Sequence, residues 1–149
     1  MANYKSNASL DEMNEYAMDL FHKGFTCAEA TMYTLKKYYP NLPYDEKSIS
    51  MSSTFPWGLG GGGCLCGALA GGEMILGSIY GRKSFDETRT EECFDKAKVL
   101  HDKFKELNGA TCCRVLMKGL ERNDPKRKEN CSGYVKNTIK IMKDLIESA

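Results

Sequence analysis

The sequence predicts an all-α protein: a single-domain bundle of five to six helices over residues 1–149, with a Gly-rich loop leading into a buried central helix. Three observations predict this fold. The 149-residue length suits one domain, and 42% hydrophobic with 28% charged residues is a globular balance. Apolar residues recur at the three- and four-residue spacing of helical faces. No segment shows the apolar–polar alternation that marks a half-buried strand.

The first two helices are predicted from capping boxes. Ser9 with Glu12, and Thr26 with Glu29, have the S/T-x-x-E spacing. In this arrangement each side chain satisfies the other residue's free backbone N–H at the start of a helix. We expect the second helix to end at Tyr39, because a proline follows it. The connection that comes next has room for one short helical turn over about 45–51.

Ten of the fourteen glycines lie between Trp57 and Gly81. We expect 58–63 to be a loop, because a glycine run is costly to keep helical. From about Leu65 a buried helix follows, whose small residues permit close packing within the chain or in a homodimer. Glu73 lies in the middle of this stretch, which indicates a core helix and no membrane insertion.

The same glycine run contains a lone G-x-G-x-x-G. A dinucleotide site needs a buried strand before this motif and a βαβ unit around it. The residues before it are polar and interrupted by a proline, so we expect no nucleotide site there. The near-neutral net charge of +1 likewise predicts no nucleic-acid partner, which would need a basic excess.

The second half of the chain also follows a helical pattern. We expect a polar helix over about 85–108 and a short helix over 111–119 that is capped by Thr111. Residues 120–129 are charged and contain a proline, which predicts a solvated linker. Asn130 is the expected cap of the last helix.

The seven cysteines need a chemical explanation. The first residues show no apolar secretory segment, so we expect a cytoplasmic protein whose thiols stay reduced. An odd number of cysteines also fits poorly with a complete set of intramolecular disulfides. Metal or cluster ligation and thiol redox chemistry are the two candidates.

The cysteines gather at predicted helix starts. A helix N-terminus carries about half a positive charge and free N–H groups, which stabilise a thiolate and lower its pKa. If these starts converge, their sulfurs would meet among N–H donors, as an iron–sulfur cluster requires. The cysteines at such starts are Cys27, Cys66, Cys112, Cys113 and Cys131, whereas Cys64 lies in the loop and Cys93 inside a helix.

The sequence around four of these cysteines resembles a known family. Residues 66–71 read C-G-A-L-A-G and match a C-G-A-x-x-G motif. Further anchors are F-T-C-A-E-A around Cys27, C-R-V-L from Cys113 and C-S-G-Y-V from Cys131. Over most of its length the chain thus resembles the C_GCAxxG_C_C family of small redox-active proteins, whose four hallmark cysteines fall by position on Cys27, Cys66, Cys113 and Cys131.

This family is similar to the non-haem part of split-Soret cytochrome c, a module associated with an iron–sulfur centre. The resemblance implies a redox role here, without covalent haem, because the chain has no C-x-x-C-H. We therefore expect an iron–sulfur cluster, [2Fe–2S] or [4Fe–4S], on Cys27, Cys66, Cys113 and Cys131. Cys64 and Cys112 are potential substitutes as ligands. The expected role is electron transfer or redox sensing with an unidentified redox partner.

Two alternatives remain open. The chain could be a thiol–disulfide redox protein with Cys66 as a low-pKa attacking thiol, although it has no C-x-x-C. It could also be an interaction module with a structural metal such as zinc. Structural zinc sites usually pair their cysteines as C-x₂₋₄-C, which the spacing of the four hallmark cysteines does not follow.

Overall fold

The computed structural model describes residues 3–149 and is all-α, with no strand in that range. Five helices are long, and three α-helices and a 3₁₀ helix (η1) have only four or five residues. The short elements account for the difference from the predicted five to six helices. The elements are α1 (Leu10–His22), α2 (Cys27–Tyr38), α3 (Glu46–Ser50), η1 (Met51–Thr54), α4 (Pro56–Leu59), α5 (Gly67–Tyr80), α6 (Glu91–Asn108), α7 (Cys113–Leu116) and α8 (Pro125–Glu147).

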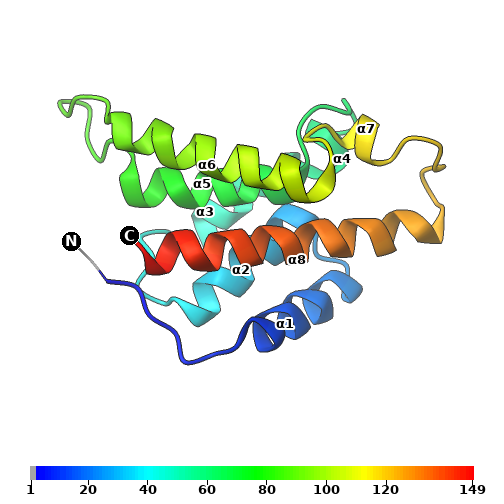
Figure 1. Ribbon diagram of the computed structural model, residues 1–149, viewed down its shortest axis with the longest axis horizontal. Coiled ribbons are helices and arrows are strands. Elements are labelled where there is room, and N and C mark those ends of the chain that lie inside the picture. Colours follow the sequence, from blue (N-terminus) through cyan, green and yellow to red (C-terminus); the bar gives the residue numbers. More distant parts are fainter. Residues whose placement is uncertain (1–2) are drawn as a thin grey trace.

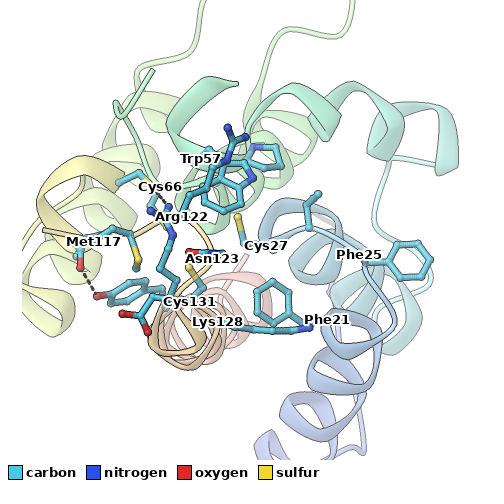
Figure 2. A pocket seen from close by; sticks show the side chains of 18 of the residues that line it. Phe21, Phe25, Cys27, Trp57, Cys66, Met117, Arg122, Asn123, Lys128 and Cys131 are labelled. Atoms are coloured by element: carbon cyan, nitrogen blue, oxygen red, sulfur yellow. Dashed lines mark hydrogen bonds between the residues drawn. The ribbon is translucent and has the colours of Figure 1, made fainter. Parts of the chain in front are cut away.

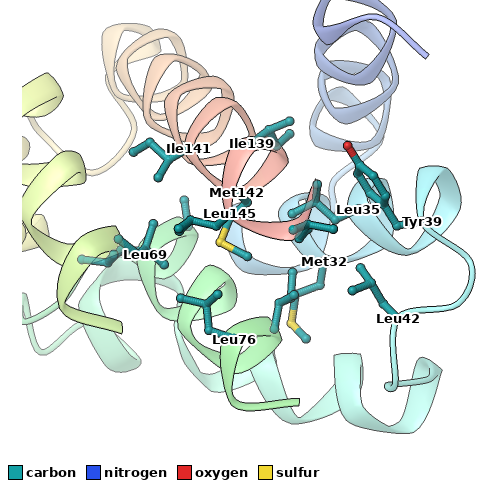
Figure 3. Packing of buried hydrophobic residues seen from close by; sticks show 14 of the residues in the cluster. Met32, Leu35, Tyr39, Leu42, Leu69, Leu76, Ile139, Ile141, Met142 and Leu145 are labelled. Carbon is teal, nitrogen blue, oxygen red and sulfur yellow. The ribbon is translucent and has the colours of Figure 1, made fainter. Parts of the chain in front are cut away.

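The long helices pack around one hydrophobic core with α5 at its centre (Figures 1 and 3). α5 contacts α2, α6 and α8. This confirms the predicted buried central helix. Within residues 3–149 no helix is long and apolar enough to cross a membrane. The fully buried side chains include Met32 and Leu35 from α2, Leu69 and Leu76 from α5, and Ile139 and Met142 from α8.

Glycines let α5 approach its neighbours closely. A Cβ atom on Gly71 would lie 3.2 Å from the carbonyl oxygen of Ala28 in α2. A Cβ on Gly72 would lie 2.9 Å from a methyl carbon of Leu100 in α6 and 3.3 Å from one of Thr138 in α8. These small residues therefore serve packing within the chain. Because these contacts lie within one chain, they do not test the predicted homodimer.

The predicted N-cap residues of the first two helices are correct, but the complete capping box forms only in the second. The Ser9 hydroxyl accepts a hydrogen bond from the Glu12 N–H. At Thr26 and Glu29 both hydrogen bonds of the capping box form, at 3.2 and 3.0 Å. The start of α2 is therefore fixed by its local sequence, and Cys27 is its first residue.

Three later helix starts were predicted incorrectly. α6 begins at Glu91 after a Thr90 cap, and not near residue 85. The cap of α7 is Cys112 and not Thr111, and this helix ends at residue 116 and not at 119. α8 begins at Pro125, because the Asp124 carboxylate caps it and proline suits the first helical position. The expected linker is therefore correct over 120–124 and wrong over 125–129, and the Asn130 cap is wrong.

The helix directions bring several starts together. The first residues of α2, α5, α7 and α8 lie at one end of the bundle, on the right in Figure 1. α6 runs the opposite way, and the C-terminus lies at the other end of the bundle (Figure 1). The fold thus collects four helix starts at a single place.

Candidate functional site

A cavity of about 440 Å³ lies where these four helices begin, and four thiols line it (Figure 2). They are Cys27, Cys66, Cys113 and Cys131, the four residues that the family resemblance singled out. Cys64, Cys93 and Cys112 are not among the residues that line the cavity, and Cys64 is exposed in the loop. The four cysteines therefore line one cavity, and their convergence on a single point stays a prediction.

Cys27 and Cys131 reach the cavity from different helical positions. Cys27 is the first residue of α2. Cys131 lies in the second turn of α8, because this helix begins six residues earlier than the cysteine. The prediction that Cys131 stands at a helix N-terminus is thus wrong, although its sulfur still faces the shared cavity.

Two backbone hydrogen bonds hold Cys66 and Cys113 beside each other. The N–H of Cys66 donates to the Thr111 carbonyl at 2.7 Å. The N–H of Arg114 donates to the Gly63 carbonyl at 2.9 Å. The loop before α5 and the segment before α7 therefore run alongside each other. Cys66, the cap of α5, and Cys113, the first residue of α7, are brought to one wall of the cavity.

A glycine beside the site makes room for a sulfur. A Cβ atom on Gly67 would lie 2.5 Å from the sulfur of Cys27. No other residue fits there unless the thiol moves. This contact explains why glycine directly follows Cys66 in the C-G-A-x-x-G motif of this chain.

The segment from α4 to the start of α5 has a strained backbone. Trp57, Leu59 and Leu65 have φ values of 63°, 62° and 58°, in the left-handed region that suits glycine. A Cβ on Gly58 would lie 2.6 Å from the carbonyl carbon of Gly63, so the loop folds tightly back on itself. Non-glycine residues in this region cost about 1–2 kcal/mol each, and such strain concentrates at functional sites.

Burial raises the pKa of the thiols that line the cavity. It raises the pKa of Cys66 to about 11 and that of Cys131 to about 12. The pKa values of Cys27 and Cys113 are also raised, in both cases chiefly by burial, and negative charge on neighbouring sulfurs adds to the effect at Cys27. The predicted low-pKa thiols are therefore wrong for the metal-free chain, because loss of water outweighs the N–H donors at the helix starts.

The sulfurs do have N–H donors around them. The backbone N–H of Ala28 opposes the rise in the pKa of Cys27, and those of Ala68 and Leu69 oppose the rise in the pKa of Cys66. Sulfur ligands favour iron–sulfur clusters, zinc and copper(I), and N–H donors are typical of the surroundings of cluster sulfurs. Within residues 3–149 no three Cys, His, Asp or Glu side chains are close enough to share one metal ion. The four thiols thus line the cavity without being drawn together around one point.

Positively charged side chains border the cavity mouth. Arg122 and Arg127 lie over the Trp57 ring, with their guanidinium carbons 4.6 and 4.2 Å from its centroid. Lys128 lies 5.5 Å from the centroid of Phe21 (Figure 2). The Arg127 guanidinium also stands 4.0 Å from the Cys113 sulfur.

The sequence did not indicate these cations, because the charged residues and the proline of 120–129 are typical of a solvated linker. Asp124 followed by Pro125 is the signal that could have shown a helix start there. That start turns Arg127 and Lys128 into residues of the first turn of α8 and carries them to the cavity.

Comparisons with known proteins agree with this arrangement. The family described as "Putative redox-active protein (C_GCAxxG_C_C)" matches residues 25–145, a range that includes all four cavity cysteines. An "Uncharacterized protein" of Archaeoglobus fulgidus is 25% identical over 133 residues, covering 84% of this chain and 87% of that protein. No solved structure matches the chain.

Proposed function

Because this chain belongs to the C_GCAxxG_C_C family of redox-active proteins, we propose that it holds an iron–sulfur cluster for electron transfer or redox sensing. The proposed ligands are Cys27, Cys66, Cys113 and Cys131. One observation carries the proposal: four thiols from four separate helices line a single cavity. We expect the protein to work in the cytoplasm, where thiols stay reduced and available for iron.

The residues around the thiols suit a negatively charged, sulfur-ligated group. When bound, such a cluster supplies one-electron oxidation and reduction. The N–H groups of Ala28, Ala68 and Leu69 favour the thiolate forms of Cys27 and Cys66 by lowering their pKa values, and Arg127 adds a positive charge beside Cys113. Both features stabilise negative charge on the sulfurs, which favours the reduced state and raises the reduction potential.

The proposal is tested by anaerobic purification followed by reconstitution with iron and sulfide. We expect a coloured protein that contains both elements and accepts one electron reversibly. Electron paramagnetic resonance measures this reduction. A colourless chain that lacks iron and sulfide after reconstitution would overturn the proposal. A chain that instead retains stoichiometric zinc and takes up no iron would favour the structural metal module.

The thiol–disulfide alternative predicts fast alkylation of Cys66 below pH 7. We expect the opposite, because burial raises the pKa of this thiol to about 11. In the metal-free protein the exposed thiol of Cys64 should react first. Peptide mapping by mass spectrometry after brief iodoacetamide treatment measures the order. Rapid modification of Cys66 at pH 6–7 would support thiol redox chemistry in place of the cluster.

A further inference from the structure

We propose that the same cavity binds a small organic anion, a carboxylate or phosphate ester, beside the four thiols. The inference rests on the proposed function in so far as the anion would lie next to a redox centre. Sites for small molecules are typically about 300–1,000 Å³ and mostly apolar, with a few placed polar groups. The cavity of about 440 Å³ is of this size, and its walls include Phe21, Trp57, Met117 and Tyr134.

The charge at the mouth of the cavity is not balanced by the protein. Among residues 3–149, none of Arg122, Arg127 and Lys128 forms an ion pair with a carboxylate. One carboxylate, that of Asp124, does line the cavity, but it caps α8 by accepting a hydrogen bond from the Lys126 N–H at 2.9 Å. The cavity therefore presents excess positive charge to any molecule that enters it.

The three cations have different neighbours. Arg127 is the one near a sulfur, 4.0 Å from Cys113, and it can balance charge on the proposed thiolate ligands. All three have an aromatic neighbour, which is Trp57 for Arg122 and Arg127 and Phe21 for Lys128, but within residues 3–149 Arg122 and Lys128 have no sulfur partner. These two remain available for a second negative group that arrives from solvent.

Stacking on an aromatic ring prepares Arg122 for anion binding. Its guanidinium lies over the Trp57 ring and is held there by a cation–π interaction. This contact uses no N–H group of Arg122 in a hydrogen bond, so these groups can still donate to a carboxylate or phosphate. Lys128 adds a second positive charge at the same mouth. The aromatic walls would contact the apolar body of the ligand.

Trp57 is the single tryptophan of the chain, so its fluorescence reports on the cavity. The reconstituted protein is titrated with benzoate, phenyl phosphate and benzamide, the last being a neutral analogue of benzoate. We expect saturable changes in emission with the two anions and at least tenfold weaker binding of benzamide. Equal binding of benzoate and benzamide, or no saturable change with either anion, would overturn the inference.

Substitution of the cations localises the binding. Arg122→Gln and Lys128→Gln should each weaken anion binding about tenfold. Lys126→Gln is the matched control, because it removes the same charge from the same helical turn but this residue does not line the cavity. Circular dichroism verifies that each variant is folded. A loss of binding in the control equal to that in Arg122→Gln would overturn the placement of the anion.

The inference and the proposed function fail in different ways. A double variant, Cys66→Ser with Cys131→Ser, should lose iron yet still bind benzoate, because the cations and Trp57 remain. If the unsubstituted chain takes up no iron but binds the anions, the proposed function fails and the anion site stands. If it takes up iron and responds to neither anion, the inference is overturned. Arg122, Arg127 and Lys128 would then fit an acidic protein partner instead.

Discussion

Around Met32 and Leu69 the helices fill the space between them, whereas around Cys66 the same helices leave a cavity of about 440 Å³ (Figures 2 and 3). α2, α5 and α8 contribute to both regions. In the core, their side chains are mostly apolar and at most 6% exposed. At the cavity the same helices present thiols, and the adjoining loop has left-handed backbone.

The difference shows how one bundle can support a strained site. The core holds the buried apolar side chains of the chain, and their burial stabilises the fold. The cavity end lowers the stability of the fold. It keeps Trp57, Leu59 and Leu65 in left-handed conformations, and it leaves space unfilled. Substitutions in the core should therefore change stability, and substitutions at the cavity should change binding.

The largest expected effect comes from a matched pair of leucines. Leu35 is fully buried in the core, whereas Leu116 is half-buried and lines the cavity. Leu35→Ala should lower the free energy of unfolding by about 2–5 kcal/mol, because it removes packed atoms and leaves a hole. Leu116→Ala should cost less than half as much, since one side of this residue already faces open space. Urea denaturation measures both, and equal losses would contradict the comparison.

Two glycines of α5 test the same contrast. Gly72→Ala would push a methyl group against Leu100 and should destabilise the core by about 1–3 kcal/mol. The iron content after reconstitution should not change in this variant. Gly67→Ala would instead place its methyl group on the Cys27 sulfur and should lower the iron content per chain. Equal iron binding by both variants would contradict the contrast between the core and the cavity.

Helix caps provide a smaller effect. Thr26 caps α2 beside Cys27, and Thr90 caps α6 at the far end of the bundle. Thr26→Ala and Thr90→Ala should each cost about 1 kcal/mol of stability. Only the first should also reduce iron retention during dialysis, because only Thr26 fixes the start of the helix that carries a proposed ligand.

The last expected effect is a pH dependence of stability. Burial in α5 raises the pKa of Glu73 from 4.5 to about 7. Between these values the folded state binds more protons than the unfolded state, so stability falls as the pH rises through this window. Glu73→Gln should flatten that decline in urea melts at about pH 5 and about pH 8. An unchanged slope would show that Glu73 stays ionised in the fold.

Local signals in the sequence predicted much of this architecture. The Thr26–Glu29 capping box fixed the start of α2, because both partners lie within one turn. The Gly-rich stretch correctly indicated a loop followed by a buried helix. The start of α8 was missed, because the charged residues around Asp124 and Pro125 resembled a linker.

The chemistry of the site depended on tertiary contacts that local patterns do not contain. The sequence predicted that Cys27, Cys66, Cys113 and Cys131 meet, but it predicted lowered pKa values for them. Burial is set by how the helices pack, and it raises these pKa values. The left-handed conformation of Trp57 and the position of Arg122 over its ring likewise result from the folded loop and not from a motif.

The most direct test of the central claim is the iron and sulfide content per chain, measured after anaerobic reconstitution in all seven single Cys→Ser variants. We expect loss of iron and sulfide in variants of the four cavity cysteines. Variants of Cys64, Cys93 and Cys112 should contain as much iron and sulfide as the unsubstituted chain. Full iron and sulfide in every cavity variant, or equal losses in all seven, would contradict it.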